Sequence, residues 1–239
     1  MKPVLFAGPT LYNVSMPSMI EFDMRPPARC GDILQAMKGG ADRIGLIDGF
    51  FGDCRSVWQK EILFALSQGV CIFGAASMGA LRAAECDHYG MIGIGEIYND
   101  YKEGRRTADS DVAMLHGPQE LDYIALTLAL VDAEATIKCL ESSKAITASE
   151  AAIMHQTAAT LGFRHRTWTA IFANAGFTAE QAAQIKATYH ECFVSRKTQD
   201  ALSLIGFITD FNTAGHCAVQ KFMPARTVYL ERLLREFAG

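Results

Sequence analysis

The sequence predicts an α/β protein: a core built on a mostly parallel sheet with flanking helices, followed by an all-helical C-terminal region. In the first half of the chain, short unbroken apolar runs alternate with helical patterns, which is typical of parallel strands covered on both faces. In the second half, alanine-rich segments with helical spacing are separated by glycines. We therefore expect an α/β core over residues 1–117, and over residues 118–239 a helical region that packs on it and docks partners.

The first half divides into alternating expected elements. The expected strands cover residues 4–7, 43–47, 70–74 and, as a further one, 111–115. The expected helices cover residues 31–38, 56–67 and 78–86. Asp53 and Ser56 are candidate N-caps of the second helix, and Gly69 is its expected stop. The proline-rich residues 26–29 are expected to form an extended surface segment, with Arg29 as a docking contact.

The second half is expected to be helical throughout. The expected helices cover residues 118–140, 148–161, 167–175, 179–194 and 197–207. Thr178 and Gln181 have the spacing of a capping box, in which each side chain bonds the backbone amide of the other residue.

Composition excludes several classes of protein. The chain has 239 residues, 50% of them hydrophobic, and no apolar run long enough to span a bilayer. Its formal net charge of −4 gives no electrostatic support for nucleic-acid binding. The apolar stretch at the amino terminus is too short for a signal peptide. Because the histidines are not clustered and no phosphate-loop motif occurs, we predict no metal site and no cofactor.

The seven cysteines lack CxxC spacing. Cys71, Cys139 and Cys192 lie within apolar patterns and are expected to be small core residues. We expect a reduced, cytoplasmic protein.

The most informative segment is residues 70–86, where a strand pattern ends in small residues and a helix follows at once. Ser77 stands at this corner, in a segment, AASMG, that nearly matches the G-x-S-x-G nucleophile elbow. The backbone amides of Met78 and Gly79, at the helix start, are candidate oxyanion donors. The alternative is that Ser77 is a helix N-cap, a role that would commit its hydroxyl.

A serine nucleophile needs a base, and Lys60 is the candidate. The helix expected over residues 56–67 is apolar nearly all round, with Val57 and Phe64 flanking Lys60. A lysine that loses hydration there has a lowered pKa, which makes its neutral amine available as a base. The alternative is that the ammonium reaches solvent or pairs with a carboxylate.

Loops that follow the expected strands supply further candidate substrate-binding residues. The carboxyl ends of parallel strands meet at one edge of the sheet, so we expect Gly8, Thr10, Asp48 and Gly49 to lie near Ser77. Asp48 is a candidate to orient the lysine or to bind substrate; it also fits a turn with Gly49.

Arg82 is a further candidate for binding a substrate or partner. Glu85 follows it by three residues on the same expected helix, so an i,i+3 ion pair is the alternative.

Taken together, several segments over residues 3–130 resemble the TfuA-like family. They are GPT at 8–10, PPA-x-x-GD at 26–32, GADRIGLIDGFFGD at 40–53, SVWQKEILFALSQG at 56–69 and FGAASMGALRAAE at 73–85. The resemblance implies a partner of YcaO enzymes in peptide backbone thioamidation, including the biosynthesis of ribosomally made, modified peptides of the trifolitoxin type. In such pathways YcaO activates the peptide amide with ATP.

The resemblance also implies an enzyme that hydrolyses a thiocarboxylated, ThiS-like sulfur carrier and helps YcaO to engage the precursor peptide. The active site of the family is hydrolase-like, with a Ser–Lys pair, and the matching positions are Ser77 and Lys60. A non-catalytic adaptor that docks YcaO, carrier and peptide is the alternative. A nucleotide-binding domain is a third possibility, and it has no phosphate motif to support it.

Overall fold

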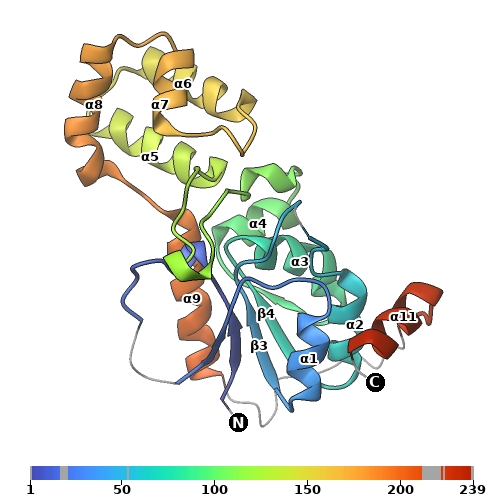
Figure 1. Ribbon diagram of the computed structural model, residues 1–239. Coiled ribbons are helices and arrows are strands. Elements are labelled where there is room, and N and C mark those ends of the chain that lie inside the picture. The colour runs from blue at the N-terminus through green and yellow to red at the C-terminus, as the bar shows by residue number, and fades with distance from the viewer. Residues whose placement is uncertain (1, 17–20, 53, 212–221, 223, 238–239) are drawn as a thin grey trace. The chain divides into compact units, whose positions relative to one another are not determined.

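The structure is a computed structural model that describes residues 2–16, 21–52, 54–211, 222 and 224–237 (Figure 1). The chain divides into two compact units. The first comprises residues 1–107 and 198–239, and the second comprises residues 108–197.

The first unit contains a five-stranded parallel sheet with the strand order β2-β1-β3-β4-β5. The strands are β1 (Val4–Phe6), β2 (Asp23–Arg25), β3 (Arg43–Leu46), β4 (Cys71–Gly74) and β5 (Ile92–Gly93). Every residue of β1 and β4 is buried. Burial on both faces explains why these strands are unbroken apolar runs in the sequence. The predicted parallel α/β core is confirmed.

Helices cover both faces of this sheet (Figure 1). They are α1 (Asp32–Lys38), α2 (Gln59–Ser67), α3 (Met78–Cys86), α4 (Glu96–Lys102) and α9 (Arg196–Asp210). A further helix, α11 (Val228–Phe237), packs on α1 and α2. On one face, Leu204 and Ile208 of α9 pack with Leu5 and Phe73 of the strands. A Cβ on Gly45 of β3 would lie 2.5 Å from Leu5 Cδ1 and 2.9 Å from Ile208 Cδ1. The close packing of α9 therefore depends on a glycine in β3.

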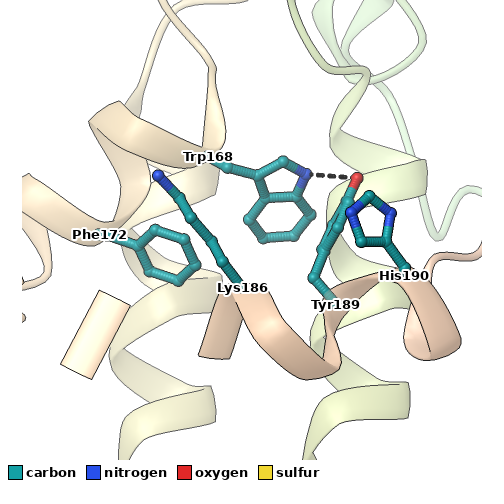
Figure 2. A pocket seen from close by; sticks show the side chains of 5 residues that line it. All are labelled: Trp168, Phe172, Lys186, Tyr189 and His190. Carbon is teal, nitrogen blue, oxygen red and sulfur yellow. Dashed lines mark hydrogen bonds between the residues drawn. The ribbon is translucent and has the colours of Figure 1, made fainter. Parts of the chain in front are cut away.

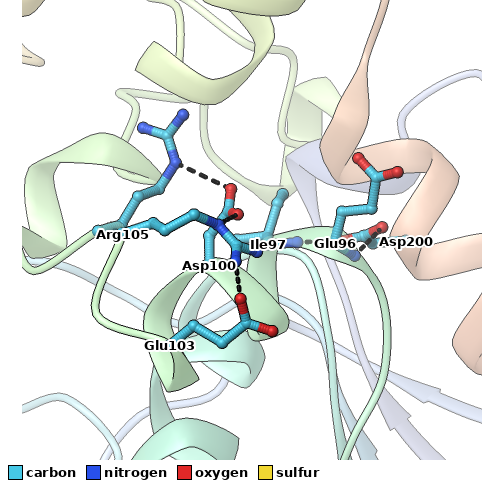
Figure 3. A network of polar contacts seen from close by, with 7 residues as sticks. Glu96, Ile97, Asp100, Glu103, Arg105 and Asp200 are labelled. Atoms are coloured by element: carbon cyan, nitrogen blue, oxygen red, sulfur yellow. Dashed lines mark hydrogen bonds and ion pairs between the residues drawn. The ribbon is translucent and has the colours of Figure 1, made fainter.

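A second link joins α9 to α4 (Figure 3). The N-cap residue of α4 is Gly95, which has no side chain to offer. The buried carboxylate of Asp200 takes this role, because it accepts hydrogen bonds from Glu96 N at 3.0 Å and Ile97 N at 2.8 Å. Arg105, which follows α4, donates to Asp100 of this helix at 2.7 Å. The first turn of α4 is thus held by a residue about a hundred positions away in sequence.

The predicted helices at 31–38, 56–67 and 78–86 are present as α1, α2 and α3, with ends that differ by up to three residues. The strand predicted at 111–115 is wrong, since residues 109–111 form a short 3-10 turn and no strand follows it there. The sequence also missed β2, β5 and α4, which are short elements with weak periodicity.

Residues 26–29 are not the extended surface segment that was expected. Ala28 is fully buried and pairs with Gly49: Ala28 N donates to Asp48 O at 2.9 Å, and Phe50 N donates to Ala28 O at 3.0 Å. Arg29 is exposed, with its guanidinium carbon 4.8 Å from the centroid of the Phe50 ring. The segment was misassigned because it makes its contacts with a loop distant in sequence.

The second unit is helical. Its helices are α5 (Leu130–Ser142), α6 (Ala148–Thr160), α7 (Trp168–Asn174) and α8 (Ala179–Cys192), packed around one apolar cluster. The helix predicted over 118–140 begins only at Leu130. The predicted capping box is confirmed, because Thr178 N donates to Gln181 Oε1 and Gln181 N donates to Thr178 Oγ1.

The division into units places the C-terminal helices differently from the sequence expectation. The helix expected at 197–207 corresponds to α9, which packs on the sheet of the first unit rather than extending one continuous helical region. The last helix, α11, belongs to the same unit and packs on α1 and α2. The apolar face of α9 carries Ala201, Leu204, Ile205 and Ile208. Sequence shows that such a face exists, but not which surface it covers.

Cys71 and Cys192 are buried, as predicted for core residues, and Cys139 is half-buried. The expectation of reduced cysteines is wrong at Cys71, which is disulfide-bonded. Among the described helices, none has both the length and the apolar character needed to cross a membrane.

Candidate active site

The candidate site lies at the carboxyl edge of the sheet in the first unit. The strand order 2-1-3-4-5 reverses direction between β1 and β3. Ligands of open α/β sheets bind in the crevice beyond the strand ends at such a reversal. The loops after β1 and β3 contain residues 8–10 and 48–49, which the sequence singled out.

Asp48 holds the loop that follows β1. Its Oδ2 accepts hydrogen bonds from Gly8 N at 2.9 Å and Thr10 N at 3.0 Å, and its Oδ1 accepts one from Thr10 Oγ1 at 2.6 Å. Asp48 is 2% exposed and Thr10 is 4% exposed. A buried carboxylate with several donors is well satisfied, so this cluster is a rigid part of the edge. The predicted grouping of these residues is present.

Gly49 brings the β3 loop against the start of α3. A Cβ at this position would lie 2.7 Å from Met78 Cγ and 3.1 Å from Ala28 O. Glycine is therefore required for the loop to pack beside Met78, next to Ser77 in sequence.

Ser77 occupies the corner between β4 and α3 and is 2% exposed. It has the N-cap position, and its carbonyl accepts from Ala80 N at 3.0 Å, but its side chain makes no capping hydrogen bond. The preceding residue, Ala76, has φ of 67°. A left-handed alanine is strained, and such strain concentrates at functional corners. The alternative, in which the Ser77 hydroxyl caps the helix, is therefore wrong.

Two glycines permit the sharp turn at Ser77. A Cβ on Gly79 would lie 1.8 Å from Leu46 O, and one on Gly74 would lie 2.2 Å from Gly79 O. Gly79 N donates to Ile47 O at 3.1 Å. The Gly79 amide is thus occupied by Ile47, directly after β3, whereas Met78 supplies the first amide of α3, which has no acceptor within the helix. Of the two predicted oxyanion donors, Met78 is the one that the geometry favours.

Lys60 is half-buried in the first turn of α2. Its Nζ donates to Thr227 Oγ1 at 2.8 Å, and no ion pair of Lys60 occurs among the described residues. The partner in this conformation is therefore neither a carboxylate nor Ser77. Thr227 precedes α11, and its hydroxyl also accepts from Leu230 N at 3.3 Å. The sequence missed Thr227 because it lies 167 residues from Lys60.

Arg82 forms the predicted ion pair with Glu85, Nη1 to Oε2 at 2.7 Å. Its Nε also donates to Val57 O at 2.7 Å. The guanidinium therefore joins α3 to the segment that leads into α2. These contacts give Arg82 a role in positioning the two helices that carry Ser77 and Lys60.

Glu61, beside Lys60, is a buried carboxylate that the sequence reading overlooked. It accepts hydrogen bonds from Trp58 N and Gly31 N, both at 2.9 Å, and burial raises its pKa to about 7. Glu61 therefore caps α2 and holds the residue before α1. The candidate cap Ser56 instead donates to Phe50 O, and Asp53 lies outside the described residues. The capping box of Trp58 and Glu61 was not recognised in the sequence, because tryptophan is an unusual N-cap residue.

The strand order, the clamped loops and the buried serine at a strained strand-to-helix corner define a doubly wound α/β protein. A family model described as TfuA-like protein matches residues 48–167, half of the chain. The chain belongs to the TfuA-like family, and this membership is consistent with a YcaO-associated role. A comparison with curated proteins gave no match.

Proposed function

We propose that this protein hydrolyses the thiocarboxylate of a ThiS-like sulfur carrier and supplies the sulfide to a YcaO enzyme for peptide backbone thioamidation. The precursor peptide is then bound through YcaO, in a pathway to modified peptides of the trifolitoxin type. Membership of the TfuA-like family supports the proposal. The observation that carries it is Ser77, a buried hydroxyl at a strained corner that is not used to cap the helix.

In the proposed reaction, Ser77 Oγ attacks the thiocarboxylate carbon and its proton passes to the neutral amine of Lys60. The Lys60 ammonium then gives this proton to the sulfur, the carbon–sulfur bond breaks, and hydrosulfide leaves with the electron pair of that bond. The carrier remains as an ester on Ser77, and Lys60 is again a neutral amine. Water activated by the same amine then attacks the ester carbon, releasing the carrier carboxylate and the serine hydroxyl. General-base assistance contributes about 10²- to 10⁴-fold in such reactions.

The Met78 amide is the proposed donor to the oxyanion of both tetrahedral intermediates. Removing one such donor costs about 3 to 4 kcal/mol in other hydrolases. Lys60 Nζ is bonded to Thr227 in this conformation, so the proposal requires its side chain to turn toward Ser77 when the carrier binds. Lysine has the flexible stem for such a movement.

The experiment is to incubate a thiocarboxylated ThiS-like carrier with the wild type, Ser77→Ala and Lys60→Met. The mass of the carrier and the released sulfide are followed over time. Ser67→Ala is a matched control, because the hydroxyl of this α2 serine bonds only near the end of its own helix: it donates to Phe64 O and accepts from Gln68 Nε2. The proposal expects hydrolysis to be lost in the first two variants and kept in the control.

Unchanged hydrolysis in both Ser77→Ala and Lys60→Met would overturn the proposal. Thioamidation that depends on this protein and survives Ser77→Ala would favour the adaptor alternative. In that case the protein would act by docking YcaO, carrier and peptide.

A further inference from the structure

A small pocket lies in the helical second unit (Figure 2). It is lined by Trp168, Phe172, Lys186, Tyr189 and His190, which come from α7 and α8, and has a volume of about 210 Å³. The rings of Trp168 and Tyr189 meet edge to face at 5.2 Å, and those of Trp168 and Phe172 lie 6.0 Å apart. Lys186 and His190 are exposed, so the pocket opens to solvent.

The polar groups around this pocket are hydrogen-bond donors. Trp168 Nε1 donates to Tyr189 Oη at 2.9 Å, which leaves the phenol proton of Tyr189 to be donated elsewhere. Burial raises the pKa of Tyr189, so the phenol keeps this proton. Lys186 Nζ lies 6.0 Å from the centroid of the Phe172 ring. Among the described residues, no carboxylate forms an ion pair with Lys186. The His190 ring always carries at least one N–H.

These features select for one kind of ligand. Aromatic walls favour a flat apolar group, and a cavity of about 150 Å³ is enough to bind benzene. The ammonium of Lys186 already lies over an aromatic face, so a second cation would be repelled. A carboxylate at the rim would accept charge-assisted hydrogen bonds from the lysine and neighbouring donors.

We propose that this pocket binds an acidic peptide segment, holding one aromatic side chain against Trp168 and Phe172 and a neighbouring carboxylate at Lys186. The cavity accommodates a single ring, and its open side leaves the peptide chain in solvent. The inference goes beyond the proposed hydrolysis and does not depend on it, because the pocket and the residues named for hydrolysis belong to different units.

The test uses the full-length protein and two-dimensional ¹⁵N–¹H NMR of its two tryptophan indoles, with Trp168→Phe assigning the Trp168 resonance. The probes are four blocked dipeptides: acetyl-Phe-Glu-amide, acetyl-Phe-Gln-amide, acetyl-Ala-Glu-amide and acetyl-Phe-Lys-amide. We expect the first to shift the Trp168 resonance in a saturable manner. The others are expected to bind about tenfold more weakly, since each lacks one of the two matched groups.

Lys186→Met keeps most of the side-chain stem and removes the charge. It is expected to reduce the affinity for the Phe-Glu peptide to that for the Phe-Gln peptide. Lys138→Met, an exposed lysine on α5, is the matched control and is expected to change nothing.

The proposal is overturned by any of three results. The first is no shift of Trp168 at saturating peptide, and the second is equal binding of the Phe-Lys and Phe-Glu peptides. The third is tighter binding of 3-phenylpropanoate than of the peptide, which would assign the pocket to a free aryl carboxylate instead.

Discussion

Lys60 Nζ lies 2.8 Å from Thr227 Oγ1, so the candidate base on α2 is bonded to the residue that directly precedes α11. Helix α11 is anchored by its Leu233, which packs with Cys30 and Leu34. The environment of Lys60 is therefore partly built by a C-terminal helix distant in sequence.

The contact between Lys60 and Thr227 is expected to stabilise the fold measurably. Thr227→Val keeps the shape but removes the acceptor for both Lys60 Nζ and Leu230 N, so we expect a loss of about 1 to 2 kcal/mol. Thr227→Ser keeps the hydroxyl and should stay close to wild type. A double-mutant cycle of Lys60→Met with Thr227→Val, measured by urea unfolding, should give a coupling of about 1 kcal/mol. A coupling near zero would show that the contact contributes nothing.

Gly79 is expected to tolerate no side chain. Its Cβ would lie 1.8 Å from the Leu46 carbonyl oxygen, which belongs to the strand backbone and has no room to yield. We expect Gly79→Ala to lower the free energy of unfolding by about 3 kcal/mol or more. Gly206→Ala is the control: this exposed α9 glycine has open space around it, and alanine should stabilise the helix by up to about 1 kcal/mol. Equal thermal midpoints for the two variants would contradict the packing described here.

Glu61 predicts a specific dependence of stability on pH. Its pKa is about 7 in the folded protein against 4.5 as the ordinary value. Between these values the folded state retains a proton that the unfolded state releases, so stability falls as the pH rises from 4.5 to 7. The total fall from this residue is about 3 kcal/mol.

Glu61→Gln removes this contribution, so its stability curve should be flatter than that of the wild type over the same pH range. Asp132, whose pKa burial raises to about 6, acts in the same direction in both proteins. The difference between the two urea-unfolding series therefore isolates Glu61. Parallel curves would mean that Glu61 titrates normally.

The elements that the sequence predicted best are those with strong local signals. The strands β1, β3 and β4 are continuous apolar runs, and α3 begins directly after Ser77, so both could be located without tertiary information. Asp48 and Thr10 were also grouped correctly, because parallel strands end at the same edge.

What the sequence did not predict depends on contacts between distant residues. The burial of Ala28 comes from its pairing with Gly49, and the partner of Lys60 comes from the segment before α11. The assignment of α9 to the sheet likewise depends on Gly45, whose missing side chain has meaning only once the helix is in place. Local patterns hold no information on such partners.

The most direct test of the account is a search for the ester on Ser77. The wild type is mixed with thiocarboxylated carrier, stopped with acid within the first turnover, and analysed by intact and peptide mass spectrometry. The account predicts a species with the summed mass of protein and carrier less H₂S, located on the peptide that contains Ser77 and absent in Ser77→Ala. Carrier carboxylate formed at the wild-type rate by Ser77→Ala, with no such species in either protein, would contradict it.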